Sequence, residues 1–158
     1  MTKEFEQNQS KDLVVFADFT DKAVFETVVS ITASVLQTAV KKGVPSGLVP
    51  LGGQHAFRVD QGELHLQDML YYLTRVQHQP SRALEYKPLA ASEYQYSGKY
   101  VVTGQLQEEL AASLFGNRNR KNITVLLVKK AVDHLSIKEK QLVDRLKAAL
   151  WNTHHPFI

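Results

Sequence analysis

Apolar and polar positions along this chain predict a succession of strands and helices. Leu13–Ala17 is an unbroken apolar run between polar residues, which is typical of a strand covered on both faces. Tyr100–Gly104 and Ile123–Val128 have the same character. Gly47–Leu51 is a second short strand, whereas His55–Val59 alternates with period two, as an edge strand does.

Helical spacing of apolar residues separates these strands. The pattern predicts helices over residues 23–42, 64–76, 107–115 and 136–151. Asp21 or Thr20 is a suitable N-cap for the first helix, and Gly43 follows it where a C-cap glycine belongs. Ser136 and Glu139 have the spacing of a capping box, which opens the last helix.

Two segments have weaker patterns. Gln77–Lys99 contains Pro80 and Pro88, and we expect one or two short helical turns within Ala83–Tyr94. Pro156–Ile158 at the end of the chain resembles the start of another strand.

Buried strands that alternate with helices predict parallel βαβ units. We therefore expect a three-layer α/β fold with a mainly parallel sheet. Leu13–Ala17, Tyr100–Thr103 and Ile123–Val128 would lie at its centre, and His55–Val59 would form an antiparallel edge strand. Open α/β sheets bind ligands beyond the carboxyl ends of their strands. Asp18–Asp21 and Thr103-Gly104 lie at that edge.

Composition narrows the classes of protein to which this chain can belong. The 158 residues suit a single domain, and 44% hydrophobic with 22% charged residues is ordinary for a globular protein. With 19 basic and 16 acidic residues, the net charge of +3 does not indicate a nucleic-acid partner. The chain has no cysteine, which excludes disulfides and cysteine nucleophiles. No unbroken apolar stretch approaches the roughly 20 residues that span a bilayer, so we expect a soluble polypeptide.

The sequence lacks recognisable catalytic and cofactor-binding motifs. The sequence contains neither a nucleotide-binding loop nor a nucleophile–base pair, so it predicts no cofactor and no enzymatic activity. The six histidines have no ligand spacing. Two basic groups, Arg118–Lys121 and Lys129-Lys130, flank one predicted strand, so they would lie on opposite edges of the sheet rather than in one stripe. The tyrosines of Tyr86–Tyr96 are either core residues or an interaction surface.

The order of elements resembles a von Willebrand factor A-type domain, because Asp18 and Thr20 follow the first strand and a long helix comes next. A closer resemblance is to the C-terminal domain of a bacterial family named domain of unknown function fifty-eight. The segments that match are Lys3–Glu6, Leu13–Ala17, Phe25-Glu26, Gly43–Val49 and Leu64–Leu73.

This resemblance implies that the chain is part of a longer, membrane-anchored bacterial protein, with the domain on the cytoplasmic face of the membrane. Membrane contact would then occur only through regions absent from this chain. Such proteins are commonly encoded beside MoxR-type AAA ATPases, which suggests an adaptor role with that ATPase as a partner. The family brings no established catalytic activity.

The metal site of the wider superfamily, an Asp-x-Ser-x-Ser motif with a later Asp, is degenerate here. Asp18 and Thr20 match its first two positions, but Lys22 replaces the third, and Gly104 stands where the later Asp would be. An ammonium group there would repel a divalent ion. Asp21 is the remaining carboxylate nearby, although its position suits a helix N-cap better. We therefore expect no metal, and a metal-dependent binding domain that uses Asp18 and Thr20 is the alternative.

The sequence thus favours a non-catalytic protein-interaction module. Without a bridging metal, direct side-chain contacts would have to hold the partner at the carboxyl edge. The candidate residues for that contact are Asp18, Thr20, Asp21, Lys22, Thr103 and Gly104.

Overall fold

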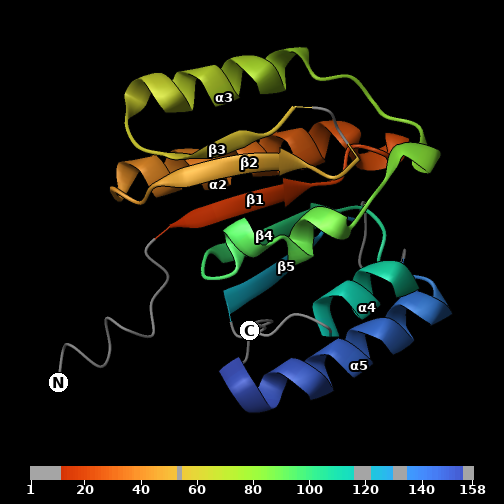
Figure 1. Ribbon diagram of the computed structural model, residues 1–158. Coiled ribbons are helices and arrows are strands. Elements are labelled where there is room, and N and C mark those ends of the chain that lie inside the picture. Colours follow the sequence, from red (N-terminus) through yellow and green to blue (C-terminus); the bar gives the residue numbers. More distant parts are fainter. Residues whose placement is uncertain (1–11, 53–54, 116–121, 130–134, 155–158) are drawn as a thin grey trace, which may run out of the picture.

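A computed structural model describes residues 12–52, 55–115, 122–129 and 135–154, the side chains of residues 115 and 147–154 excepted. Five strands form one sheet in the order β3-β2-β1-β4-β5 (Figure 1). All pairs are parallel except β2–β3, which is antiparallel. The strands are β1 (Leu13–Ala17), β2 (Ser46–Pro50), β3 (Phe57–Asp60), β4 (Gly98–Thr103) and β5 (Ile123–Leu127).

Helices connect the strands. The α-helices are α2 (Phe25–Lys41), α3 (Glu63–Arg75), α4 (Glu108–Phe115) and α5 (Ile137–His154). A 3-10 turn, η1 (Lys22–Val24), precedes α2, and three more lie between α3 and β4: η2 (Ser81–Ala83), η3 (Lys87–Ala90) and η4 (Ser92–Tyr94).

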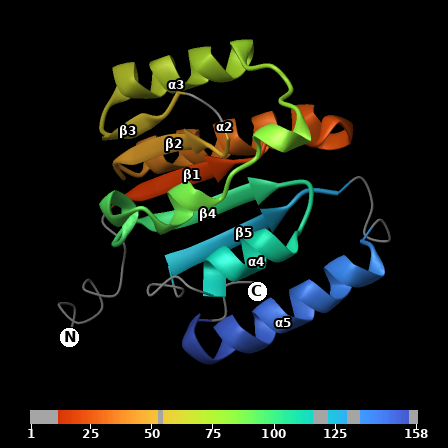
Figure 2. The ribbon, with the colours of Figure 1, turned by 45° about the vertical axis from the view of Figure 1, so that its right-hand side comes forward.

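The sheet lies between two helical layers (Figure 2). Alternate residues of β1 face opposite layers, as expected for a strand buried on both sides. Val15 packs with the buried side chains of α2 and α3, whereas Val14 packs with those of α4 and α5. The architecture is therefore α/β with a mostly parallel sheet and is consistent with a Rossmann-like fold, which confirms the expected fold class at this level.

Local signals in the sequence are confirmed at the helix ends. Asp21 accepts a hydrogen bond from the backbone N–H of Ala23 at 3.1 Å and so caps η1. Gly43 has φ of +73° directly after the helix terminus, a conformation that favours glycine. Ser136 and Glu139 form the reciprocal bonds of a capping box.

The expected strand order is wrong in one respect. Ile123–Val128 was expected at the centre of the sheet, but β5 is the outermost strand on its side of the described sheet, and β2 takes an interior place between β3 and β1. An apolar run shows that helices cover both faces of a strand, but it carries no information about neighbours within the sheet. The antiparallel edge position of the segment around His55–Val59 is confirmed, with the strand itself beginning at Phe57.

Two 3-10 turns, η3 and η4, lie within Ala83–Tyr94 and confirm the expected short helical turns there, and a third, η2, ends at Ala83. Tyr86 and Tyr94 belong to the core beneath α4, and the ring of Tyr94 meets that of Phe16 edge to face. Tyr96 is 76% exposed. Core packing therefore accounts for two of the three tyrosines in Tyr86–Tyr96.

One helical stretch, Lys22–Lys41, is long and apolar enough to cross a membrane by length and composition. This stretch is not an unbroken apolar run, because serines and threonines interrupt it. Its mean hydropathy nevertheless stays high enough for a membrane span. In the fold, α2 packs against β1, β2, β4 and α3. Its buried residues are Val28, Thr32, Leu36 and Ala39.

Several expectations lie outside the described residues. These are the strand start at Pro156–Ile158 and the basic residues Arg118, Arg120, Lys121 and Lys130.

Candidate functional site

Asp18 is the centre of a hydrogen-bond network at the carboxyl end of β1. It is 1% exposed, yet its carboxylate accepts three hydrogen bonds from the chain itself. The backbone N–H and the hydroxyl of Thr20 donate to Oδ1 at 2.9 and 2.6 Å. The hydroxyl of Thr103, at the end of β4, donates to Oδ2 at 2.7 Å. Charge-assisted bonds of this kind stabilise a buried carboxylate.

Gly104 is required by the packing of its neighbours. A Cβ atom there would lie 2.6 Å from Oδ2 of Asp21 and 2.5 Å from a methyl carbon of Val24. The Asp21 side chain therefore occupies the space that a side chain at position 104 would need. This explains sterically why no carboxylate follows Thr103.

The carboxyl edge brings the six predicted residues together but exposes few of them. Asp18, Thr20, Thr103 and Gly104 are buried. Asp21 is half-buried and Lys22 is exposed, so only these two can touch another molecule directly. The buried four instead fix the loop, and His78 supports it by donating from Nε2 to the carbonyl oxygen of Thr20 at 3.0 Å.

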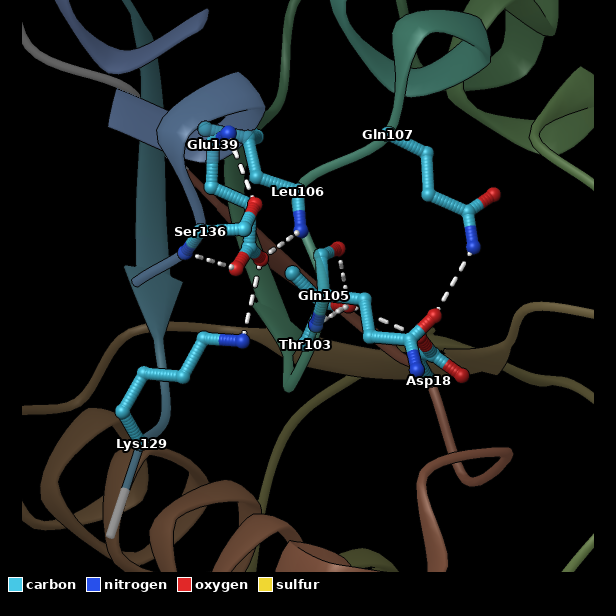
Figure 3. Close-up of polar contacts among 8 residues, drawn as sticks. All are labelled: Asp18, Thr103, Gln105, Leu106, Gln107, Lys129, Ser136 and Glu139. Carbon is cyan, nitrogen blue, oxygen red and sulfur yellow. Dashed lines mark hydrogen bonds and ion pairs between the residues drawn. The ribbon is translucent and has the colours of Figure 1, made fainter. Parts of the chain in front are cut away.

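A second hydrogen-bonded junction lies beside the Asp18 network and is centred on Glu139. The sequence pattern indicated Glu139 only as part of a helix cap. Glu139 accepts from the backbone N–H groups of Leu106 at 2.9 Å and Ser136 at 3.2 Å, and it pairs with the ammonium of Lys129 at 3.0 Å. One carboxylate therefore joins the loops after β4 and β5 to the start of α5 (Figure 3). Burial raises the pKa of Glu139, but the hydrogen bonds from Leu106, Lys129 and Ser136 outweigh burial and lower it.

Gln105 and Gln107 flank Leu106 in the loop after β4. Gln105 donates its backbone N–H to the Thr103 hydroxyl at 3.2 Å and accepts a bond from the Gln107 amide at 2.9 Å (Figure 3). A groove of about 320 Å³ opens next to them between the starts of α4 and α5. Its lining comprises Leu106, Gln107, Glu108, Glu109, Ser136, Lys138 and Glu139.

Tyr86 is a buried residue with an unsatisfied polar group, and the pattern of apolar positions does not distinguish it from the other tyrosines. The residue is 9% exposed, and its hydroxyl has no hydrogen-bond partner in the structure. Burial raises the pKa of Tyr86, and the negative charges of Asp18 and Glu109 raise it further.

Lys99 is a second anomaly, at the opposite end of β4. It is fully buried on the same face as Val14 and Ile123, and its ammonium nitrogen has no hydrogen-bond partner in the structure. Burial lowers the pKa of Lys99, while the charge of Asp12 acts in the opposite direction. A charged residue next to the apolar run Tyr100–Thr103 is not expected in the core from sequence, since lysine is almost never fully buried without a partner.

In the described part of the chain, no group of three or more His, Asp or Glu side chains converges as metal ligands would. Asp18, Thr20 and Thr103 do bring three side-chain oxygen groups together, but they are bonded to one another.

In comparisons with known proteins, the chain is similar in sequence to a longer protein. No protein-family model matches the sequence. It is 33% identical over 153 residues to YeaD of Bacillus subtilis strain 168, an uncharacterised protein. The alignment covers 92% of this chain and 37% of YeaD, so the chain spans little more than a third of that relative.

Proposed function

We propose that this chain is a non-catalytic protein-interaction domain of the von Willebrand factor A-like type, and that its partner binds at the carboxyl edge of the sheet. The observation that carries the proposal is the internal bonding of Asp18. Its carboxylate is bonded to Thr20 and Thr103 of the same chain, and Gly104 has no room for a second carboxylate. The edge is thus a rigid, self-bonded surface, which suits docking better than chemistry.

The strand order β3-β2-β1-β4-β5, with an antiparallel first strand, supports the von Willebrand factor A-like assignment. Resemblance to the family named domain of unknown function fifty-eight supports the proposed role in protein interaction. On that basis the domain belongs to a longer, membrane-anchored bacterial protein and faces the cytoplasm. The length of YeaD relative to this chain is compatible with further regions. A MoxR-type AAA ATPase is the partner to test, and the domain acts as its adaptor.

A divalent-metal-dependent binding domain is the second candidate. Three oxygen-bearing side chains, Asp18, Thr20 and Thr103, meet at one point, and Oδ2 of Asp21 lies over Gly104 next to it. Hard cations such as Mg²⁺ prefer oxygen ligands of this kind. Binding would require the hydroxyls of Thr20 and Thr103 to turn from Asp18 to the ion.

A pull-down of the MoxR-type ATPase tests the proposal. The variant is Asp21→Lys/Lys22→Glu, which exchanges the charges of the two accessible predicted residues. The matched control is Lys140→Glu/Asp144→Lys, which exchanges the same charge types on the exposed side of α5. We expect the first variant to lose binding and the control to keep it. If wild type captures no ATPase, or if only the control loses binding, the proposal is wrong.

Calorimetry with Mg²⁺ separates the two candidates. The protein-interaction proposal expects no saturable heat at millimolar metal. Saturable binding that disappears in Asp18→Ala would favour the metal-dependent domain.

A further inference from the structure

The outermost strand β5 has one row of backbone groups that no strand of the described sheet pairs with. The N–H of Val128 donates to the carbonyl oxygen of Thr103 at 2.8 Å, so Val128 faces β4. Consecutive residues of a strand direct their N–H and C=O groups to opposite sides. The groups of Ile123, Val125 and Leu127 therefore face away from β4. We call this row the outer edge of β5.

The two outermost strands of the described sheet differ in how they are protected. Edge strands of natural proteins usually carry charges, prolines or bulges, which hinder pairing with another chain. In β3, Arg58 and Asp60 are exposed, and the register with β2 is irregular between Ser46 and Leu48. The segment Ile123–Val128 has no charge and no proline, and β5 pairs with β4 in an unbroken register. Within the described sheet, the outer edge of β5 is therefore open to another strand.

The chemistry of this edge favours a neutral, apolar strand. Its N–H and C=O groups recur at every second residue, a spacing that another extended backbone matches. Val125 is 9% exposed, and Leu126 and Leu127 are half-buried against opposite core layers. A charged side chain placed beside these residues would lose hydration without gaining a partner.

A second copy of β5 meets these requirements. Antiparallel pairing about a two-fold axis sets outward-facing residues opposite outward-facing residues, so both copies satisfy their N–H and C=O groups. Because Ile123–Val128 is uncharged, the pairing sets no charge of this segment against its own copy. Lys129, the next residue, already pairs with the carboxylate of Glu139 at 3.0 Å.

We propose that two copies of this chain associate through the outer edges of β5 and form one continuous sheet across a two-fold axis. The contact uses neither Asp21 nor Lys22, so the inference goes beyond the proposed function and does not depend on it. Pairing of two strands of 5 residues each is a small contact, and small interfaces are weak. We therefore expect a monomer–dimer equilibrium that responds to protein concentration.

Light scattering during size-exclusion chromatography tests the proposal on the 158-residue chain from micromolar to millimolar concentration. The molar mass should rise from monomer towards dimer. Amide hydrogen exchange should slow at Val125 and Leu127 over the same range and stay unchanged at Leu126, whose N–H faces β4. A chain that stays monomeric throughout would overturn the proposal. A dimer without slower exchange at Val125 and Leu127 would also overturn it, and so would a monomer in which these two amides are protected at every concentration.

Thr124→Lys and Thr124→Glu test the strand pairing itself. Thr124 is half-buried on β5, and a two-fold pair brings its two copies to the same face near the axis. Each variant alone should weaken association about two- to tenfold through like-charge repulsion, and an equimolar mixture of the two should restore it.

Thr74→Lys is the matched control, since Thr74 is exposed on α3 and the substitution adds the same charge. It should associate as wild type does. Equal weakening in Thr74→Lys, or a mixture of the Thr124 variants that fails to restore association, would reject pairing through β5. Restoration in the mixture also shows that both variants are folded.

Discussion

The hydroxyl of Thr103 donates a hydrogen bond of 2.7 Å to Oδ2 of Asp18, across two adjacent parallel strands and 85 positions of sequence. Thr20 donates two further bonds to the same carboxylate. A buried carboxylate is costly unless its oxygens are bonded, so each donor lowers the energy of this edge. The bond therefore ties the end of β4 to the end of β1 at the point where a partner is proposed to bind.

Thr103→Val should lower the free energy of unfolding by about 1–3 kcal/mol, because it removes a donor to a buried charge while keeping the shape of the side chain. Urea denaturation measures this change. Thr74→Val is the control, since the exposed Thr74 hydroxyl bonds only to the carbonyl oxygen of Tyr71; it should stay within about 0.5 kcal/mol of wild type. Equal effects in the two variants would contradict the importance of the Asp18 bond.

Glu139→Gln should destabilise the protein by about 1–3 kcal/mol at pH 7, since the charged acceptor of Leu106, Ser136 and Lys129 is lost. The pKa of Glu139 is lowered in the folded protein. Its contribution is therefore complete above the unfolded value of about 4.3 and is lost as pH falls through the folded pKa.

Urea midpoints of wild type and Glu139→Gln, measured from pH 7 down to acid, check this prediction. The difference between them should shrink below about pH 4.3. Glu93→Gln, at an exposed position of η4, should show the same midpoint as wild type at every pH. A difference that is constant with pH would show that Glu139 acts through packing rather than charge.

Lys99→Met should raise the free energy of unfolding by about 1–3 kcal/mol at pH 7, because an apolar side chain replaces a buried amine without a partner. The pKa of Lys99 is lowered in the folded protein, mainly by burial. The unfolded chain thus binds a proton more readily between the folded pKa and about 10.4, and wild-type stability rises with pH over that window.

The gain from Lys99→Met should accordingly diminish as pH approaches about 10.4. Thermal or urea unfolding of both proteins at several pH values measures the gain. Lys87→Met, at an exposed position, is the control and should change stability little. A destabilised Lys99→Met would mean that the amine has a favourable interaction in solution.

Sequence alone determined the local elements of this protein. The run Leu13–Ala17 predicts a strand covered on both faces, Asp21 is one of two candidate N-caps, and Ser136 and Glu139 can be identified as a capping box. These features depend on interactions within a few residues, and the periodicity of apolar residues and the spacing of capping residues predict such interactions. The α/β class follows from the order of the elements for the same reason.

Only the tertiary structure decided which elements are neighbours and which polar groups are buried. Ile123–Leu127 is nearly as apolar as β1, yet it lies on the outside of the described sheet, because lateral order depends on contacts between distant segments. Burial of Lys99 and Tyr86, and the bond from Thr103 to Asp18, likewise depend on side chains from separate strands and turns. The candidate edge is therefore a product of folding, since Asp18 and Thr103 meet only when β1 and β4 pair.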